Sequence, residues 1–136
     1  MATAIPDLWP DLEQSQIVPP VAILREQAAA LGKKTNYLLT GRVDTRILLD
    51  GGFRHTFHVV APTLDDYSFD LFWIEHGAGQ YPVMAPPLPM GNIARAPIDE
   101  NLASENELLE YVREVLNSET TKRVVSSLLA QVKATT

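Results

Sequence analysis

The sequence of 136 residues contains no cysteine. This absence excludes disulfide bonds, thiolate metal sites and cysteine nucleophiles. A chain of this length with 46% hydrophobic residues can bury a sufficient core without such cross-links. Because a chain without disulfides is typical of reducing compartments, we expect a cytoplasmic protein.

Long apolar runs are missing as well. No stretch of the sequence approaches the ~18 consecutive apolar residues of a membrane-spanning helix. The first residues, MATAIPDLWPDLEQ, carry acids and prolines where a signal peptide has a basic start and an apolar run. We therefore expect neither a membrane span nor a signal peptide.

Basic side chains are scarce in the second half of the chain. Residues 1–64 carry six basic and six acidic side chains, and residues 65–119 carry two basic and eleven acidic ones. Residues 120–136 carry three basic side chains and no acidic one, so the net charge of the chain is -6. Nucleic acids and anionic membranes bind clustered lysine and arginine. The sequence argues against both partners, and the acidity is typical of a solvated face that maintains solubility.

Three segments have the apolar stripe of an amphipathic helix. Residues 19–31 begin with prolines, which the first helical turn tolerates, and Gly32 follows them as a helix-ending residue. Ser104 and Glu107 form a capping box at the start of a second helix. Residues 121–132 repeat the stripe after a short break, which predicts two consecutive helices at the end of the chain.

Apolar and polar residues alternate over residues 37–49 and 53–61, which predicts two half-buried strands. The residues between them, Asp-Gly-Gly at 50–52, suit a three-residue hairpin loop with a glycine in the left-handed conformation. A two-residue loop would mix apolar and polar faces. The predicted pairs are Leu49 with Phe53, Ile47 with His55, Thr45 with Phe57 and Val43 with Val59, with Asp44 opposite His58.

A third alternating strand is predicted from Tyr67, with Tyr67, Phe69, Leu71 and Trp73 on one face. If Ala61 pairs with Tyr67, His58 faces Asp70 on the other side. Residues 80–85 contain Pro82, which restricts this run to a sheet edge or excludes a strand. The proline-rich residues 86–98 predict an irregular covering connection.

These elements predict an α+β domain: an N-terminal helix, a three- to four-stranded antiparallel meander, and two C-terminal helices packed with the first on the odd-numbered face of the sheet. We assign residues 1–18 to an extended arm and residues 19–136 to this single domain. We expect this arm to fold back and cover its own domain, and the alternative is that Trp9 binds a partner.

His55 and His58 form an HxxH spacing that is often associated with metals. Consecutive strand side chains point to opposite faces, so ligands on one strand require a spacing of two rather than three. We therefore predict that His55 lies at the core rim with a hydrogen bond and that His58 lies on the polar face. No metal site follows from this pair.

His58, flanked by Asp44 and Asp70, has two interpretations. The row could hold a metal or orient an imidazole that acts as a general base. It is also what solvated cross-strand ion pairs look like on an open sheet face. The second interpretation is favoured, because no nucleophile or oxyanion feature accompanies the row.

Phe72 and Ile74 fall on the otherwise polar, even-numbered face, beside Leu48 in the predicted register. They would form an exposed apolar patch unless the arm, the proline-rich connection or another subunit covers them. Together with Trp9, they are the predicted interaction surface.

Two segments, VAILREQAAALGKKT and TTKRVVSSLLAQ, resemble segments of small uncharacterised bacterial proteins of unknown function, and this resemblance implies no activity. By fold and charge alone, a small, acidic, cysteine-free chain of this kind is similar to the cytosolic dimeric chaperones that hold secretion effectors. Those chaperones place strands between their later helices, whereas this chain ends with two helices in succession.

We expect a non-enzymatic binding or protein-interaction module, chaperone-like or regulatory, that forms a homodimer or binds another protein and uses no cofactor. The sequence leaves a small-molecule ligand open. The alternative is a small metal-assisted or histidine-based hydrolase or lyase centred on His58, Asp44 and Asp70.

Overall fold

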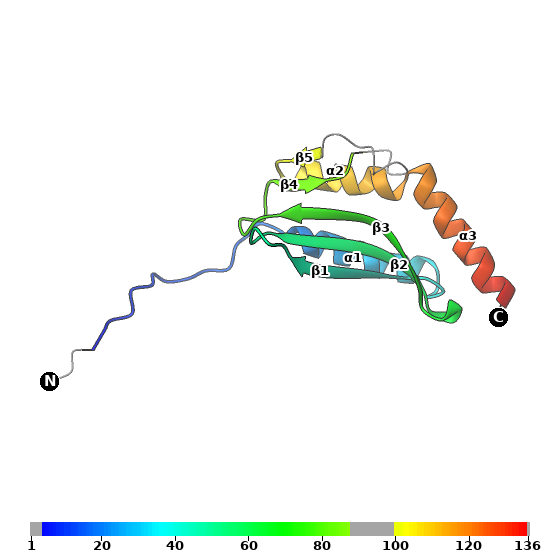
Figure 1. Ribbon diagram of the computed structural model, residues 1–136, viewed down its shortest axis with the longest axis horizontal. Coiled ribbons are helices and arrows are strands. Elements are labelled where there is room, and N and C mark those ends of the chain that lie inside the picture. Colours follow the sequence, from blue (N-terminus) through cyan, green and yellow to red (C-terminus); the bar gives the residue numbers. More distant parts are fainter. Residues whose placement is uncertain (1–3, 88–99, 136) are drawn as a thin grey trace.

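The computed structural model describes residues 4–87 and 100–135. In this part of the chain, an antiparallel sheet has the strand order β1-β2-β3-β4-β5, and the helices lie on one face of it (Figure 1). The fold is α+β as predicted, with a fifth strand that the sequence pattern did not predict. The elements are α1 (Pro20–Lys34), β1 (Thr40–Ile47), β2 (Phe53–Ala61), η1 (Pro62–Leu64), β3 (Tyr67–His76), β4 (Val83–Ala85), β5 (Glu100–Leu102), α2 (Glu105–Leu116) and α3 (Glu119–Thr135).

The hairpin between β1 and β2 turns one residue earlier than predicted. The Leu48 amide donates to the Gly52 carbonyl at 2.7 Å, so residues 49–51 form the loop, and Gly51 has a φ of 89°. Glycine suits this left-handed position because it has no Cβ. The apolar and polar faces stay as predicted, because the shift moves each pairing by two residues. The observed pairs are Ile47 with Phe53, Thr45 with His55, Val43 with Phe57 and Gly41 with Val59.

β3 contains a β-bulge, which the alternation of its sequence did not predict. The predicted pair of His58 with Asp70 is present, but the next pair joins Phe57 to Phe72, which leaves Leu71 as an extra residue. A bulge places two residues opposite one and disturbs the alternation of faces. From Phe72 onward, the even-numbered residues of β3 therefore face the helices.

β4 lies inside the sheet, between β3 and β5, so the prediction of an edge strand or none is wrong. Pro82 directly precedes Val83, the first residue of β4. A proline at this position costs no hydrogen bond of the strand ladder. The predicted connection over residues 86–98 lies outside the described residues from residue 88 onward.

α1 continues past the end that Gly32 predicted and ends at Lys34. Thr35 donates from Oγ1 to the Leu31 carbonyl at 2.9 Å, and the Tyr37 amide donates to the Gly32 carbonyl at 2.7 Å. A Cβ on Gly32 would lie 3.0 Å from the ring of Tyr37. Glycine at this position therefore makes room for the tyrosine ring rather than ending the helix.

α1 packs tightly against β1 because Gly41 has no side chain. A Cβ at Gly41 would lie 2.5 Å from the Cα atom of Ala28 in α1, a separation that real Cβ contacts do not reach. This close approach fixes the first helix against the edge strand of the sheet.

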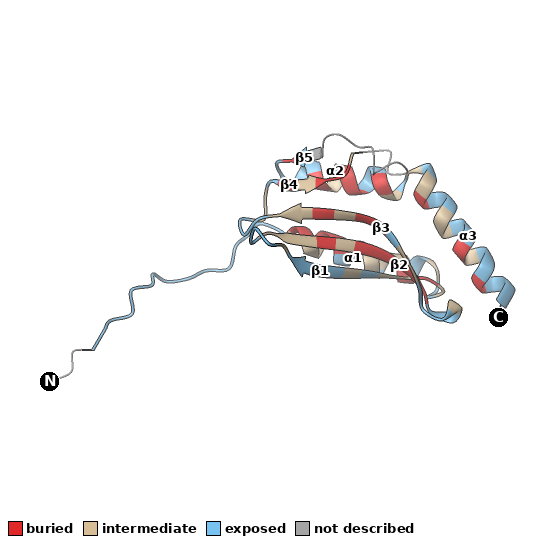
Figure 2. Cartoon of the chain, in the orientation of Figure 1, coloured by how far each residue is buried: buried red, intermediate tan, exposed pale blue. Residues whose placement is uncertain are grey.

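The predicted cap of Ser104 at the start of α2 is confirmed, but the Glu107 carboxylate binds the amide before Ser104 rather than that of Ser104 itself. Ser104 accepts from the Glu107 amide at 3.3 Å, and the Glu107 carboxylate accepts from the Ala103 amide at 2.8 Å. Buried residues are concentrated in β2 and β3 and recur along each C-terminal helix (Figure 2). The largest of these buried residues are Leu24, Leu39, Phe57, Val59, Ile74, Val83, Leu108, Val115 and Val132.

Candidate functional site

Asp44, His58 and Asp70 come together on the sheet face that the helices leave open, as the sequence predicted. Nδ1 of His58 lies 2.6 Å from Oδ1 of Asp70, and Nε2 lies 2.8 Å from Oδ2 of Asp44. Asp44 is the diagonal neighbour of His58 rather than its direct partner, because the shifted hairpin pairs His58 with Arg42. Nε2 of His58 makes no hydrogen bond, because its contact with Asp44 lacks the required alignment.

This arrangement leaves His58 little capacity for catalysis or metal binding. Its two ring nitrogens face two different carboxylates, so neither nitrogen is available to take a proton from a substrate. The carboxylates contact opposite edges of the ring, whereas metal ligands must converge on one point. Among the described residues, no group of three histidine, cysteine, aspartate or glutamate side chains is placed to hold a metal ion.

Burial in this cluster is uneven. The His58 side chain is 9% exposed, but those of Asp44 and Asp70 are 57% and 73% exposed. Carboxylates that stay in water interact weakly, and each such pair contributes less than about 1 kcal/mol to stability. The geometry therefore favours a cross-strand ionic cluster on the sheet surface.

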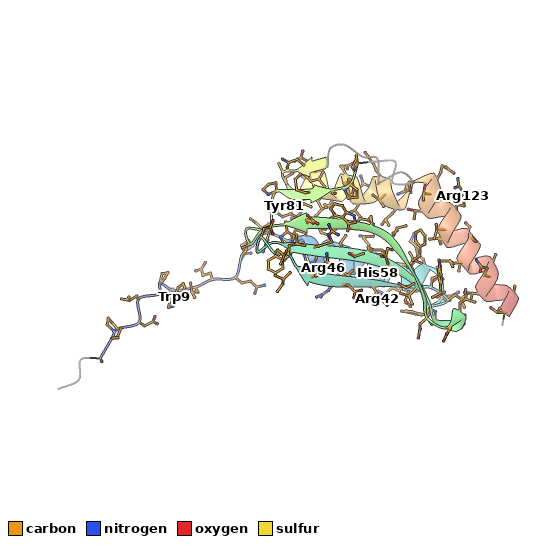
Figure 3. The ribbon with its side chains drawn as sticks, in the orientation of Figure 1. Trp9, Arg42, Arg46, His58, Tyr81 and Arg123 are labelled. Carbon is orange, nitrogen blue, oxygen red and sulfur yellow. The ribbon has the colours of Figure 1, made fainter. Side chains whose placement is uncertain are left out.

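The rest of this open face is also internally paired. Nε of Arg42 lies 3.3 Å from Oδ2 of Asp44. Nη2 of Arg42 donates across β2 to Oγ of Ser68 in β3 at 3.4 Å. Arg54 forms an ion pair with Glu75, and its guanidinium lies 4.5 Å from the ring centroid of Trp73. Figure 3 shows Arg42, Arg46 and His58 on this side of the sheet. Most charges that could recognise a ligand already have partners within the face.

His55 lies on the opposite face from His58, at the core rim, as predicted. Its Nδ1 is 2.8 Å from the Thr45 hydroxyl, and its Nε2 is 2.8 Å from Nε2 of His76, whose Nδ1 is 2.7 Å from the Gly77 carbonyl. Because a carbonyl only accepts, Nδ1 of His76 carries a proton. The two facing Nε2 atoms then share a single proton, which one ring donates and the other accepts.

The surroundings of His55 strongly disfavour its charged form. Burial, the neighbouring His76 and, to a smaller extent, Arg25 lower the pKa of His55 from 6.5 to about 4. Burial acts first because it removes water from the imidazolium, and the two basic neighbours add repulsion. His55 is therefore a neutral, hydrogen-bonded residue at neutral pH.

The predicted exposure of Phe72 and Ile74 is wrong. Phe72 is 2% and Ile74 0% exposed, and both belong to the core between sheet and helices. The bulge at Leu71 turns them to this side, where Phe72 stacks on Phe57 with ring centroids 5.5 Å apart. Leu48 remains partly exposed beside the hairpin loop, where it lines a hollow of about 420 Å³.

The N-terminal arm carries a run of exposed large apolar side chains. Trp9 is 75% exposed, and the arm extends away from the domain rather than folding back onto it (Figure 1). Tyr81 fixes the base of the arm by donating to the Val18 carbonyl at 3.2 Å. Burial, followed by the nearby Glu105, raises the pKa of Tyr81. The exposed apolar residues of the arm are Ile5, Leu8, Trp9, Leu12, Ile17 and Val18.

A hollow of about 470 Å³ lies between α3 and the start of β3. It is at the end of the sheet that lies far from the base of the arm (Figure 1). Leu64 of η1 and Tyr67 and Phe69 of β3 form one side. Val124 and Leu128 form its helix side, with Arg123, Ser127 and Gln131 around them. We call this hollow the α3 groove.

Sequence reasoning missed the contact between His55 and His76 and also the α3 groove. Both join residues that are far apart in the chain, so no local spacing reveals them. The alternation that placed Tyr67 and Phe69 toward the helices was a usable signal for the groove. It did not indicate which helix they meet or that a hollow remains between them.

Comparisons with protein-family models, with curated proteins and with solved structures found no match to this chain. Within the described residues, no helix combines the length and apolar character needed to cross a membrane.

Proposed function

We propose that this protein is a non-enzymatic, cytoplasmic protein-interaction module and that the N-terminal arm is its binding element. The observation that carries the proposal is the exposure of the arm's large apolar side chains, from 39% at Val18 to 89% at Ile5. Single exposed apolar residues are common on protein surfaces, but a contiguous group is typical of an interaction site. Six such residues within fifteen positions form such a group.

The composition of the arm supports this role. Pro6 and Pro10 restrict the backbone on both sides of Trp9 and favour an extended chain, which lowers the entropy cost of binding. Tryptophan is among the residues that contribute most to binding energy in protein interfaces. The Asp7 side chain accepts from the Trp9 amide at 3.0 Å, which further restricts the backbone just before the tryptophan.

The hydrolase or lyase alternative has no comparable support. Both ring nitrogens of His58 face carboxylates, and neither Asp44 nor Asp70 lines the hollow beside the hairpin or the α3 groove. The acidic charge of the chain supports a protein partner over a nucleic acid.

Site-specific photo-cross-linking in cells tests the proposal. A photoreactive phenylalanine analogue at position 12 is expected to form a discrete adduct with a protein that mass spectrometry identifies. The substitution Trp9→Ala in the same chain should abolish this adduct, and excess peptide of residues 4–18 should compete with it. As a control, the analogue at Leu49, which is fully exposed in the hairpin loop, should not give it. Adducts of equal yield from both positions, or none from position 12, would refute the proposal.

A further inference from the structure

We infer that the partner of the arm is a second copy of this chain, and that Trp9 of each copy occupies the α3 groove of the other. This inference rests on the proposed function, since it identifies the protein that the arm binds. The reciprocal exchange of two arms forms a closed, twofold-symmetric dimer.

The volume and lining of the groove suit the arm. Its volume of about 470 Å³ exceeds that of a tryptophan side chain and leaves room for a neighbouring residue such as Leu12. Leu64, Phe69 and Leu128 provide an apolar lining. Burial of an exposed aromatic residue against such a surface removes on the order of 150–200 Å² from water.

Charge also matches the arm to this groove. Residues 4–18 contain Asp7, Asp11 and Glu13 and no basic side chain. Arg123 lines the groove, and residues 120–136 form the part of the chain with a net positive charge. Each copy has a net charge of -6, so two copies repel one another in general. An attractive contact between them therefore has to join an acidic segment of one copy to a basic segment of the other. The acidic arm and the basic helix meet this requirement.

The distance between arm and groove favours a second copy over the same chain. Tyr81 holds Val18 near the end of β3 at His76, whereas Tyr67 in the groove begins that strand. The ten residues of β3 separate these ends by about 30 Å. Nine residue steps from Trp9 to Val18 also span at most about 30 Å when fully extended. To reach its own groove, the arm would therefore have to be fully extended in a straight line, with no spare length to follow the protein surface. Figure 3 places Trp9 and Arg123 at opposite ends of the molecule.

Disulfide trapping between two singly substituted proteins tests this arrangement, because the chain has no cysteine of its own. Proteins carrying Leu8→Cys and Ser127→Cys are mixed and mildly oxidised. We expect a covalent adduct containing one copy of each, at about twice the chain mass of 15.0 kDa. Ser126→Cys is the matched control, since Ser126 is also exposed on α3 but lines a different hollow. Its adduct yield should be at least tenfold lower.

Solution mass gives a second measurement. The unmodified chain is expected to be a dimer at micromolar concentration, and Trp9→Ala should raise its dissociation constant at least about 30-fold. Gln14→Ala, in the same arm, should leave the dimer intact. Because Trp9 lies outside the folded core, circular dichroism should show an unchanged fold in both variants.

Three outcomes would overturn this inference. The first is a mixture that gives no adduct while the double variant Leu8→Cys, Ser127→Cys closes a disulfide within one chain, which would place the arm on its own groove. The second is a monomeric protein at all concentrations tested. The third is an arm that cross-links in cells only to a different protein, in which case the proposed function stands and self-association fails.

Discussion

Acid should destabilise this protein through His55. In the folded state its pKa is about 4, against an ordinary value of 6.5. The unfolded chain therefore binds more protons between these two values, and the free energy of unfolding decreases as the pH falls from 6.5 toward 4. Above about pH 7 the residue is neutral in both states and contributes no pH dependence.

The size of the effect follows from the shift. A difference of 2.5 pKa units between folded and unfolded states corresponds to about 3 kcal/mol of stability lost over the whole range. Near pH 5, almost one full proton is taken up on unfolding at this residue. The resulting slope is about 1 kcal/mol per pH unit, a sizeable fraction of a total stability of about 5–15 kcal/mol.

The assay is urea unfolding at a fixed protein concentration between about pH 4 and pH 8, for the unmodified chain and for His55→Gln. Glutamine does not titrate and keeps a polar group beside Thr45 and His76. We expect His55→Gln to be less stable at neutral pH and to lose this disadvantage as the pH falls. The acidic side chains are common to both proteins, so the difference between the two curves isolates His55.

Nuclear magnetic resonance of the His55 ring provides the direct measurement. In His76→Gln its pKa should rise part of the way toward 6.5, because burial, the larger cause, remains. Parallel unfolding curves for the unmodified chain and His55→Gln, or titration of His55 at its ordinary value, would refute the reasoning.

Three further predictions concern the fold and the ionic cluster. Gly41→Ala should lower the free energy of unfolding by about 1–3 kcal/mol, because the added Cβ collides with the α1 backbone. Gly77 has open space around it, so Gly77→Ala should have little effect. Equal effects of the two substitutions would contradict the observed packing. Phe72→Ala should cost about 3–5 kcal/mol in chemical denaturation and Trp73→Ala clearly less; the reverse order would mean that β3 has no bulge. One equivalent of Zn²⁺ should leave the thermal unfolding midpoint unchanged, and a rise that His58→Gln abolishes would establish a metal site that we do not expect.

The hairpin shows which features of the fold the local sequence pattern predicts and which it does not. Alternation along β1 and β2 predicted two strands, a three-residue loop and the opposite faces of His55 and His58. It misplaced the loop by one residue, because both Gly51 and Gly52 tolerate a left-handed backbone. Only pairing with the neighbouring strand selects one of them.

The bulge in β3 had the largest consequence for the predicted interaction surface. Strict alternation placed Phe72 and Ile74 outside, yet these apolar residues are more stable in the core, and one extra residue at Leu71 allows them to reach it. The gain from burying two large side chains exceeds the cost of one disturbed pair in the ladder. The sequence contained this conflict but did not show where it is resolved.

The sequence by itself determined the α+β class, the helix start at Ser104, the absence of cysteine chemistry and the neighbourhood of Asp44, His58 and Asp70. These depend on periodicity and short-range spacing, which the chain fixes locally. Only the tertiary structure decided that His58 faces a carboxylate at each ring nitrogen, that His76 meets His55, and that a groove remains beside α3. Such contacts join residues from separate elements, and their geometry depends on how sheet and helices pack together.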